Sequence, residues 1–204
     1  MPTREEVPQS RSHPPRKGTG DRVPSIDWCF GIGQPLEAAI EHLYTADLFI
    51  TSETTSSLCA TVNRIDLAVR SSGPVLRLKA GSTGEELSRV LIAWKDEPAA
   101  RRAMHASRPL LALANEIFVV GVGDEVASER LEELAIFLGN DERPCRAIHL
   151  EKSGANAGFD IRRFAQSEGI ELLVSGAKSD LSLRERLFGD VTGKLKSMQS
   201  FHSS

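Results

Sequence analysis

From Arg89 onward the chain alternates short apolar runs with longer amphipathic segments, and no other feature constrains its fold as strongly. Short apolar runs are typical of strands buried on both faces, and apolar residues three or four apart are typical of helices with one buried face. Their regular alternation predicts βαβ units. The fold class that follows is α/β, a doubly wound parallel sheet with covering helices.

Four strands and four helices are expected in this part of the chain. The strands are predicted at residues 90–94, 117–122, 147–150 and 172–174, and the helices at residues 97–114, 128–138, 159–168 and 183–198. Pro98 suits the first turn of the first helix, Ser128 suits the N-cap of the second, and Gly139 suits its end. We expect the strand order 3-2-1-4, with a fifth position that is either empty or filled by residues 75–78.

The upstream segment repeats part of this pattern when the chain is compared with itself at an offset of about 124 positions. An amphipathic helix at residues 37–44 then falls on residues 161–168, and the apolar residues 47–52 fall on residues 171–176. The strand predicted at residues 74–78 falls on residues 198–202, which are too polar for a buried strand. This repeat predicts a first unit without its front half and a second unit without its last strand.

The domain boundaries follow from these patterns. Residues 1–25 are rich in proline and charge and are predicted to be a disordered tail. Residues 26–82 form the partial first unit, residues 86–198 the domain lacking a clear last strand, and residues 199–204 a tail.

Composition argues against several classes of protein. A formal net charge of -3 gives no electrostatic footprint for nucleic acid, and no apolar run approaches the roughly 18 residues that span a bilayer. Cys29, Cys59 and Cys145 show no paired or zinc-binding spacing, so neither a disulfide framework nor a metal site is expected. The N-terminal residues lack the apolar segment of a secretory signal. We expect a cytoplasmic protein that binds neither nucleic acid nor membrane.

Two segments, residues 90–103 and 172–192, together resemble the universal stress protein (UspA) family in its tandem form, over roughly residues 28–198. In that family a glycine after the fourth strand, a second three residues later and a third ten residues further on, followed by a small hydroxyl residue, surround nucleotide phosphates. The resemblance implies a Rossmann-like or flavodoxin-like sheet, ATP or AMP as ligand, and a homodimer formed through the sheet edge.

The chain keeps part of this loop and departs from the rest. Gly176 and Gly189 occupy the first and third glycine positions, Ser179 replaces the middle glycine, and Asp190 replaces the hydroxyl residue. A carboxylate beside a polyanion is unfavourable. We weigh a remnant nucleotide cradle against an ordinary strand-to-helix loop, and the sequence slightly favours the ordinary loop.

The end of the first strand, where the resemblance implies the adenine base, also departs from the family pattern. Lys95 stands where ATP-binding members have an aspartate that accepts from the adenine amino group, and a lysine only donates. Asp96 can replace that acceptor if the loop shifts, and Val122 matches the apolar residue beside the base. No catalytic or metal-binding residue is assigned. The candidate nucleotide-binding residues are Lys95, Asp96, Val122, Gly176, Ser179, Gly189, Asp190, Val191 and Thr192.

Two other features suggest chemistry and are better explained by structure. His105 and His149 have no nearby nucleophile or ligand spacing in the sequence, so both are expected to be structural or surface residues. The glycine-rich residues 153–158 precede a helix and can capture an anion, but a flexible connector is the preferred interpretation.

Three functions remain open at this point. The preferred one is a non-enzymatic stress-response domain that senses a small molecule through a degenerate adenine-nucleotide loop. The alternatives are a weak adenine-nucleotide hydrolase and a ligand-free protein interaction module.

Overall fold

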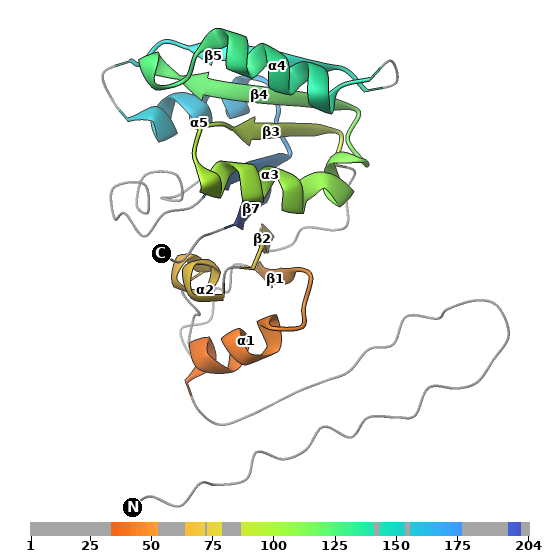
Figure 1. Cartoon of the computed structure of the whole chain (residues 1–204), viewed down its shortest axis with the longest axis vertical. Helices are drawn as coiled ribbons and strands as arrows, with labels where there is room; N and C mark the ends of the chain where they lie inside the picture. The colour runs from red at the N-terminus through yellow and green to blue at the C-terminus, as the bar shows by residue number, and fades with distance from the viewer. Residues whose placement is uncertain are drawn as a thin grey trace, which may run out of the picture.

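In the part of the chain that the structure describes, seven strands form one mixed sheet, with helices on both faces (Figure 1). The computed structural model describes residues 34–52, 64–71, 73–78, 87–140, 143–153, 156–176 and 196–200. The predicted tail at residues 1–25 and residues 183–195 of the predicted last helix lie outside these ranges.

The alternation of strands and helices is confirmed downstream of residue 86. The elements are β3 (Arg89–Ala93), α3 (Pro98–Leu111), β4 (Glu116–Val122), the 3₁₀ helix η1 (Gly123–Glu125), α4 (Ser128–Leu138), β5 (Cys145–Leu150), α5 (Ala157–Ser167) and β6 (Leu172–Gly176). All pairings in the order β5-β4-β3-β6 are parallel, as expected for the order 3-2-1-4. Pro98 lies in the first turn of α3, whereas the N-cap of α4 is Ala127 and not Ser128.

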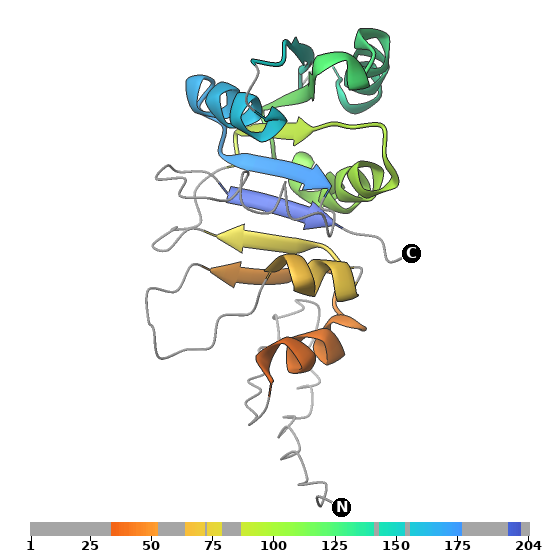
Figure 2. The same ribbon diagram turned by 90° about the vertical axis from the view of Figure 1, so that its left-hand side faces the viewer.

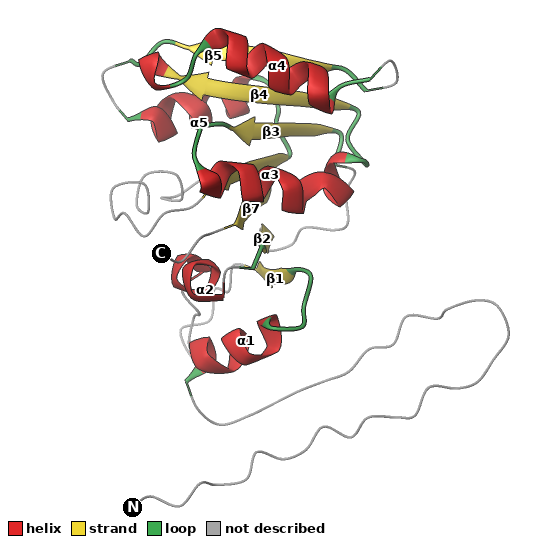
Figure 3. Ribbon diagram, in the orientation of Figure 1, coloured by secondary structure: helices red, strands yellow, loops and turns green. Residues whose placement is uncertain are grey.

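Both faces of this sheet carry buried side chains. Successive side chains of a strand point in opposite directions, so one strand contributes to the core on each face. Val90 and Ile92 of β3 belong to an apolar cluster with residues of α3 and α4, and Leu91 belongs to a cluster with residues of α5. Figure 2 shows α5 on one side of the strands and α3 and α4 on the other, and Figure 3 shows the three layers by element type. This two-sided burial explains the continuous apolar runs of the strands.

The upstream part adds α1 (Pro35–Leu43), β1 (Phe49–Ser52), α2 (Arg64–Ser71) and β2 (Val75–Leu78). Ile40 and Leu43 of α1 pack with Leu67 of α2 and Val75 of β2 in a separate apolar cluster. At the offset of 124 positions, α1 and β1 fall on α5 and β6, so the repeat read in the sequence is also a repeat of structure.

The fifth position of the sheet is filled by β7 (Lys196–Ser200), which lies parallel to β6. The predictions of a helix as far as Met198, of a missing last strand and of a tail from residue 199 are therefore wrong. β2 does not fill that position but pairs antiparallel with β7 on its other side, as the opposed arrows in Figure 2 show. The order of the whole sheet is β1-β2-β7-β6-β3-β4-β5.

The two units differ in the number of residues between their last two strands, and this difference explains why β7 was not predicted from the sequence. Phe49 pairs with Val75, 26 positions later, whereas Leu173 pairs with Ser197, only 24 positions later. A fixed offset therefore placed the expected strand two residues too far along, in the polar end of the chain. β7 has a strand on each side, and its backbone pairing does not require the apolar side chains by which strands are recognised.

Cys145, at the start of β5, provides a test of the packing between β5 and α4. Burial raises the pKa of its thiol to about 11, above its ordinary value of 9.0. A raised pKa in the folded state gives stability that is lost as the pH rises from the unfolded value through the folded one. Between pH 8 and pH 10 we expect the protein to lose more unfolding free energy than Cys145→Ala does, by less than about 1 kcal/mol, because solvent screens a thiol that is only partly buried. Urea unfolding of both proteins at each pH measures the difference, and parallel curves would show that the thiol is not buried.

Candidate functional site

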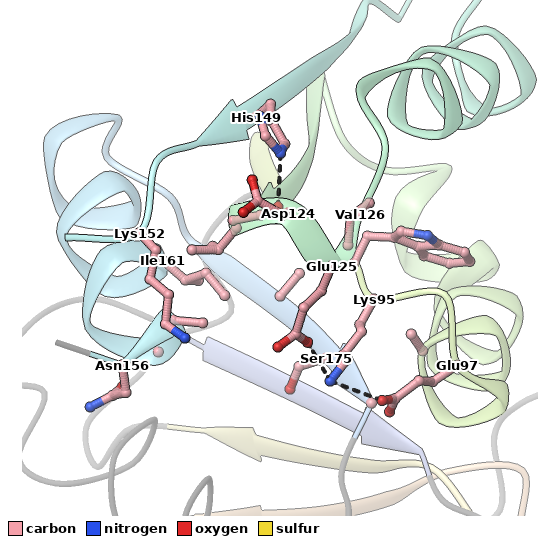
Figure 4. A pocket seen from close by; sticks show the side chains of 18 of the residues that line it. Lys95, Glu97, Asp124, Glu125, Val126, His149, Lys152, Asn156, Ile161 and Ser175 are labelled. Carbon is pink, nitrogen blue, oxygen red and sulfur yellow. Dashed lines mark hydrogen bonds and ion pairs between the residues drawn. The ribbon is translucent and has the colours of Figure 1, made fainter. Parts of the chain in front are cut away.

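A cavity of about 910 Å³ lies at the carboxyl ends of β3, β4, β5 and β6 (Figure 4). Open parallel sheets bind their ligands at this edge. Ala93 of β3, Val122 of β4 and Ser175 of β6 line the cavity from three adjacent strands. Ile161 of α5 adds an apolar wall, and η1 and the first residues of α3 and α5 complete it.

The structure brings three of the predicted site residues together and separates a fourth from them. Lys95, Val122 and Gly176 all line the cavity, whereas Asp96 does not. The Asp96 carboxylate instead contacts Arg101 of α3 and lies 3.9 Å from the Arg130 Nε of α4. Its hydrogen bond with Arg101 lowers the pKa of that carboxyl. Asp96 therefore does not replace the missing acceptor in this conformation.

The other five candidates, Ser179, Gly189, Asp190, Val191 and Thr192, lie outside the described residues.

Lys95 is held between two carboxylates of the cavity wall. Its ammonium lies 3.1 Å from Glu97 Oε1 and 2.6 Å from Glu125 Oε2, as the dashed lines in Figure 4 show. Hydrogen bonds to Glu125 and Glu97 raise the pKa of Lys95, and the Lys95 hydrogen bond lowers the pKa of Glu125. Lys95 and Glu125 are thus both charged at neutral pH.

Gly176 has a structural reason to be glycine. A Cβ built on it would lie 2.6 Å from the backbone nitrogen of Ala100 and 2.7 Å from the carbonyl carbon of Ala99. The end of β6 therefore crosses directly against the first turn of α3. This contact accounts for the first glycine of the loop without any phosphate.

Ser175 places a buried hydroxyl in the cavity. The residue is only 3% exposed, and its Oγ has no hydrogen-bond partner within the described part of the chain. Figure 4 shows this hydroxyl among the cavity side chains, between Lys95 and Asn156. Buried hydroxyls are normally hydrogen-bonded, so this one is suited to a polar group of a ligand or to a water molecule.

His149 lies at the cavity rim, exposed on β5, as expected for a surface histidine. Its Nε2 is 3.0 Å from the carbonyl oxygen of Gly123, to which a protonated Nε2 donates. Gly123 has a φ of +67°, which a residue with a side chain rarely adopts, and so it fixes the turn from β4 into η1. The contact of His149 with this turn supports a positioning role for the ring.

The segment before α5 is anchored by side chains. The Asn156 side chain caps α5 by accepting from the Phe159 N–H at 3.0 Å. Asp160 is 7% exposed and accepts hydrogen bonds from the backbone and the hydroxyl of Ser153. These contacts satisfy donors that an anion would otherwise use at this helix N-terminus.

The charges of the cavity wall oppose a phosphate ligand. Four carboxylates, of Glu97, Asp124, Glu125 and Glu151, face two ammonium groups, of Lys95 and Lys152. Sequence reasoning missed these carboxylates because they come from three separate loops with no motif in common. The described residues therefore do not fit an adenine polyphosphate.

No group of three or more His, Cys, Asp or Glu side chains suited to a metal ion occurs among the described residues. Within the same ranges, no helix combines the length and hydropathy needed to cross a membrane.

Comparisons with known proteins bear on the fold. No protein-family model and no curated protein matches the sequence. The structure is similar to that of a universal stress protein from Archaeoglobus fulgidus DSM 4304, with a TM-score of 0.66 and 14% identity, over 83% of this chain and 66% of that one. A universal stress protein family member from Burkholderia pseudomallei matches with a TM-score of 0.39 and 18% identity, over 60% of this chain and all of that one. The first likeness shows that the protein has the α/β fold of universal stress protein structures.

Proposed function

We propose that this chain is a universal-stress-type protein of the tandem kind, which binds a small molecule in the carboxyl-edge cavity and senses it without catalysing a reaction. The observation that carries the proposal is the cavity itself, with the Ser175 hydroxyl on its wall and Lys95 fixed beside it. Its place in the sheet is the ordinary ligand position of this architecture.

The adenine-nucleotide loop is degenerate in this proposal. Lys95 donates where an acceptor is needed, and Glu97 and Glu125 hold it in that state. Asp190 adds a further carboxylate in the sequence of the loop. ATP and AMP are therefore expected to bind weakly.

The described cavity residues also support a role without catalysis. A serine nucleophile needs a base within hydrogen-bond reach. The Ser175 hydroxyl has no such partner in the described ranges, and the His149 ring contacts the backbone carbonyl of Gly123. This arrangement gives no support to the alternative of a nucleotide hydrolase.

The partner in this proposal is a second copy of the chain, in the cytoplasm, joined through an outer edge of the sheet. β7 is already paired on both sides, so among the described strands the outer edges are those of β1 and β5. Ile50 of β1 is 56% exposed, and unpaired strand edges are ready to pair with another chain.

A fragment screen followed by thermal unfolding tests the proposed function. The library should contain amines, carboxylates and uncharged heterocycles, together with ATP, ADP and AMP. We expect some fragments to stabilise the protein but not Ala93→Leu, whose larger side chain extends into the cavity. Ile136→Ala, a change on the exposed face of α4, is the control and should respond as the unaltered protein does.

Two results would contradict the proposal. A stabilisation of several degrees by ATP that disappears in Ala93→Leu would show an intact nucleotide site. If every fragment affects the protein and Ala93→Leu alike, or none affects either, the interaction module becomes the better function. The exposed Ile136 (81%) and Phe137 (57%) at the end of α4 favour that second candidate, because large apolar side chains exposed together are typical of contact surfaces.

A further inference from the structure

The carboxylates of the cavity wall fall into two pairs. Glu97 and Glu125 share the ammonium of Lys95, at 3.1 and 2.6 Å. Asp124 and Glu151 also line the cavity, and neither forms an ion pair with a residue in the described ranges. Lys152 is close enough to Glu125 to contribute to the lowered pKa of that carboxyl. The described residues of the wall therefore keep an excess of negative charge after their two lysines are counted.

We propose that the cavity takes a small molecule in which a cationic amine is joined to an apolar or aromatic body, and that it discriminates against phosphorylated molecules. This inference rests on the proposed function and names the ligand class of the same site. A cation gains from every carboxylate of the wall, whereas a phosphate is repelled by each of them.

The remaining walls suit the other half of such a ligand. Ala93, Val122 and Ile161 are apolar and lie on the face of the sheet that α5 covers. The buried Ser175 hydroxyl lies beside them and can accept a hydrogen bond from an amine N–H. Ligand sites of this kind combine apolar walls with a few polar groups that set orientation.

One feature of the cavity favours an anion, and the structure offsets it. The N-terminus of α5 opens on the cavity through Asn156, Ala157 and Gly158. The side chain of Asn156 already caps this helix, and the buried Asp160 places a negative charge in its first turn. The Asn156 cap and the Asp160 carboxylate therefore offset most of the attraction of the helix N-terminus for a phosphate.

Lys95 acts as an internal competitor in this account. Its ammonium already occupies the position between Glu97 and Glu125 that a ligand amine would favour. Lys95→Met removes the competitor and keeps a chain of similar length. The variant should therefore bind amines more tightly. If Lys95 instead bound a nucleotide directly, its replacement would weaken the binding of that nucleotide.

Two pairs of probes, each with a shared aromatic body and opposite charge, test the proposal by calorimetry. One pair is 5′-amino-5′-deoxyadenosine and AMP, and the other is tryptamine and indole-3-acetate. The amine of at least one pair should bind more tightly than its anion. Glu151→Gln should weaken amine binding about two- to fivefold, and Lys95→Met should strengthen it by a similar factor. Lys95→Arg, which keeps the ion pairs, should resemble the unaltered protein.

Glu132→Gln, on the exposed side of α4, removes the same charge away from the cavity and should leave binding unchanged. Anions that bind more tightly than their amines would overturn the charge inference and leave the small-molecule function standing. Probes that do not bind in either form would count against the inference, and the fragment screen would then decide the function separately. Weaker amine binding in a folded Lys95→Met would overturn the role of Lys95.

Discussion

Gly176→Ala should lower the free energy of unfolding by about 3 kcal/mol, because the new methyl group would overlap backbone atoms that cannot rotate away. The added Cβ would lie 2.6 Å from Ala100 N and 2.7 Å from Ala99 C, in the first turn of α3. Relief requires β6 and α3 to separate, and both contribute to the larger apolar cluster. Chemical denaturation of the two proteins measures the loss.

Gly73→Ala is the matched control for this change. A Cβ on Gly73 would lie 3.5 Å from Ser71 Oγ and 3.7 Å from Leu43 Cδ2, which are ordinary contact distances. We expect this control to change the unfolding free energy by less than about 0.5 kcal/mol. Equal effects at the two positions would show that the contact between β6 and α3 is not as close as described. The same close contact would then no longer explain the glycine at the start of the loop.

Phe118→Ala should lower the free energy of unfolding by about 4 kcal/mol, the cost of deleting a fully buried aromatic ring. Phe118 lies in the middle of β4, is 1% exposed and meets Phe164 of α5 edge-on at 5.8 Å. The guanidinium carbons of Arg89 and Arg146 lie 5.1 and 5.4 Å from its ring centre. Deletion leaves a cavity and also removes a surface on which both cations rest.

Phe159→Ala provides the comparison, because Phe159 is 48% exposed on α5 and its truncation leaves no internal cavity. Its effect should stay below about 1 kcal/mol. Phe118→Leu should fall between the two, because leucine refills part of the space. An unfolding free energy for Phe118→Ala close to that of Phe159→Ala would contradict the packing of α5 against β4.

The sequence predicted the elements whose apolar side chains indicate that they are buried. β3, β4 and β6 are apolar on both faces, so their existence could be derived from periodicity, and their alternation with helices predicted parallel pairing. β7 could not, because the sequence of Lys196–Ser200 is largely polar and its place depends on backbone pairing with β6 and β2. Long-range pairing of that kind leaves no local pattern to read.

The residues of the candidate site also fall into those that the sequence predicted and those that it did not. The family resemblance pointed to Lys95, Val122 and Gly176, and all three line the cavity because each follows or ends a strand at the same edge of the sheet. Asp96 is the next residue after Lys95, and the chain turns at this point, with the Glu97 N–H donating to the Lys95 carbonyl oxygen at 2.6 Å and the Asp96 carboxylate contacting Arg101 of α3. The carboxylates of the wall could not be foreseen, because turns and loops distant in the sequence bring them together.

Amide chemical shifts of the isotope-labelled protein, followed during a titration with 5′-amino-5′-deoxyadenosine, test most directly whether the carboxyl-edge cavity is the ligand site. The account predicts that the largest shifts occur at Val122, Gly123, Ser175 and Gly176, that they are smaller in Ala93→Leu, and that the amides of α1 and α2 do not respond. Shifts that are confined to the exposed end of α4, or that are identical in Ala93→Leu, would contradict it.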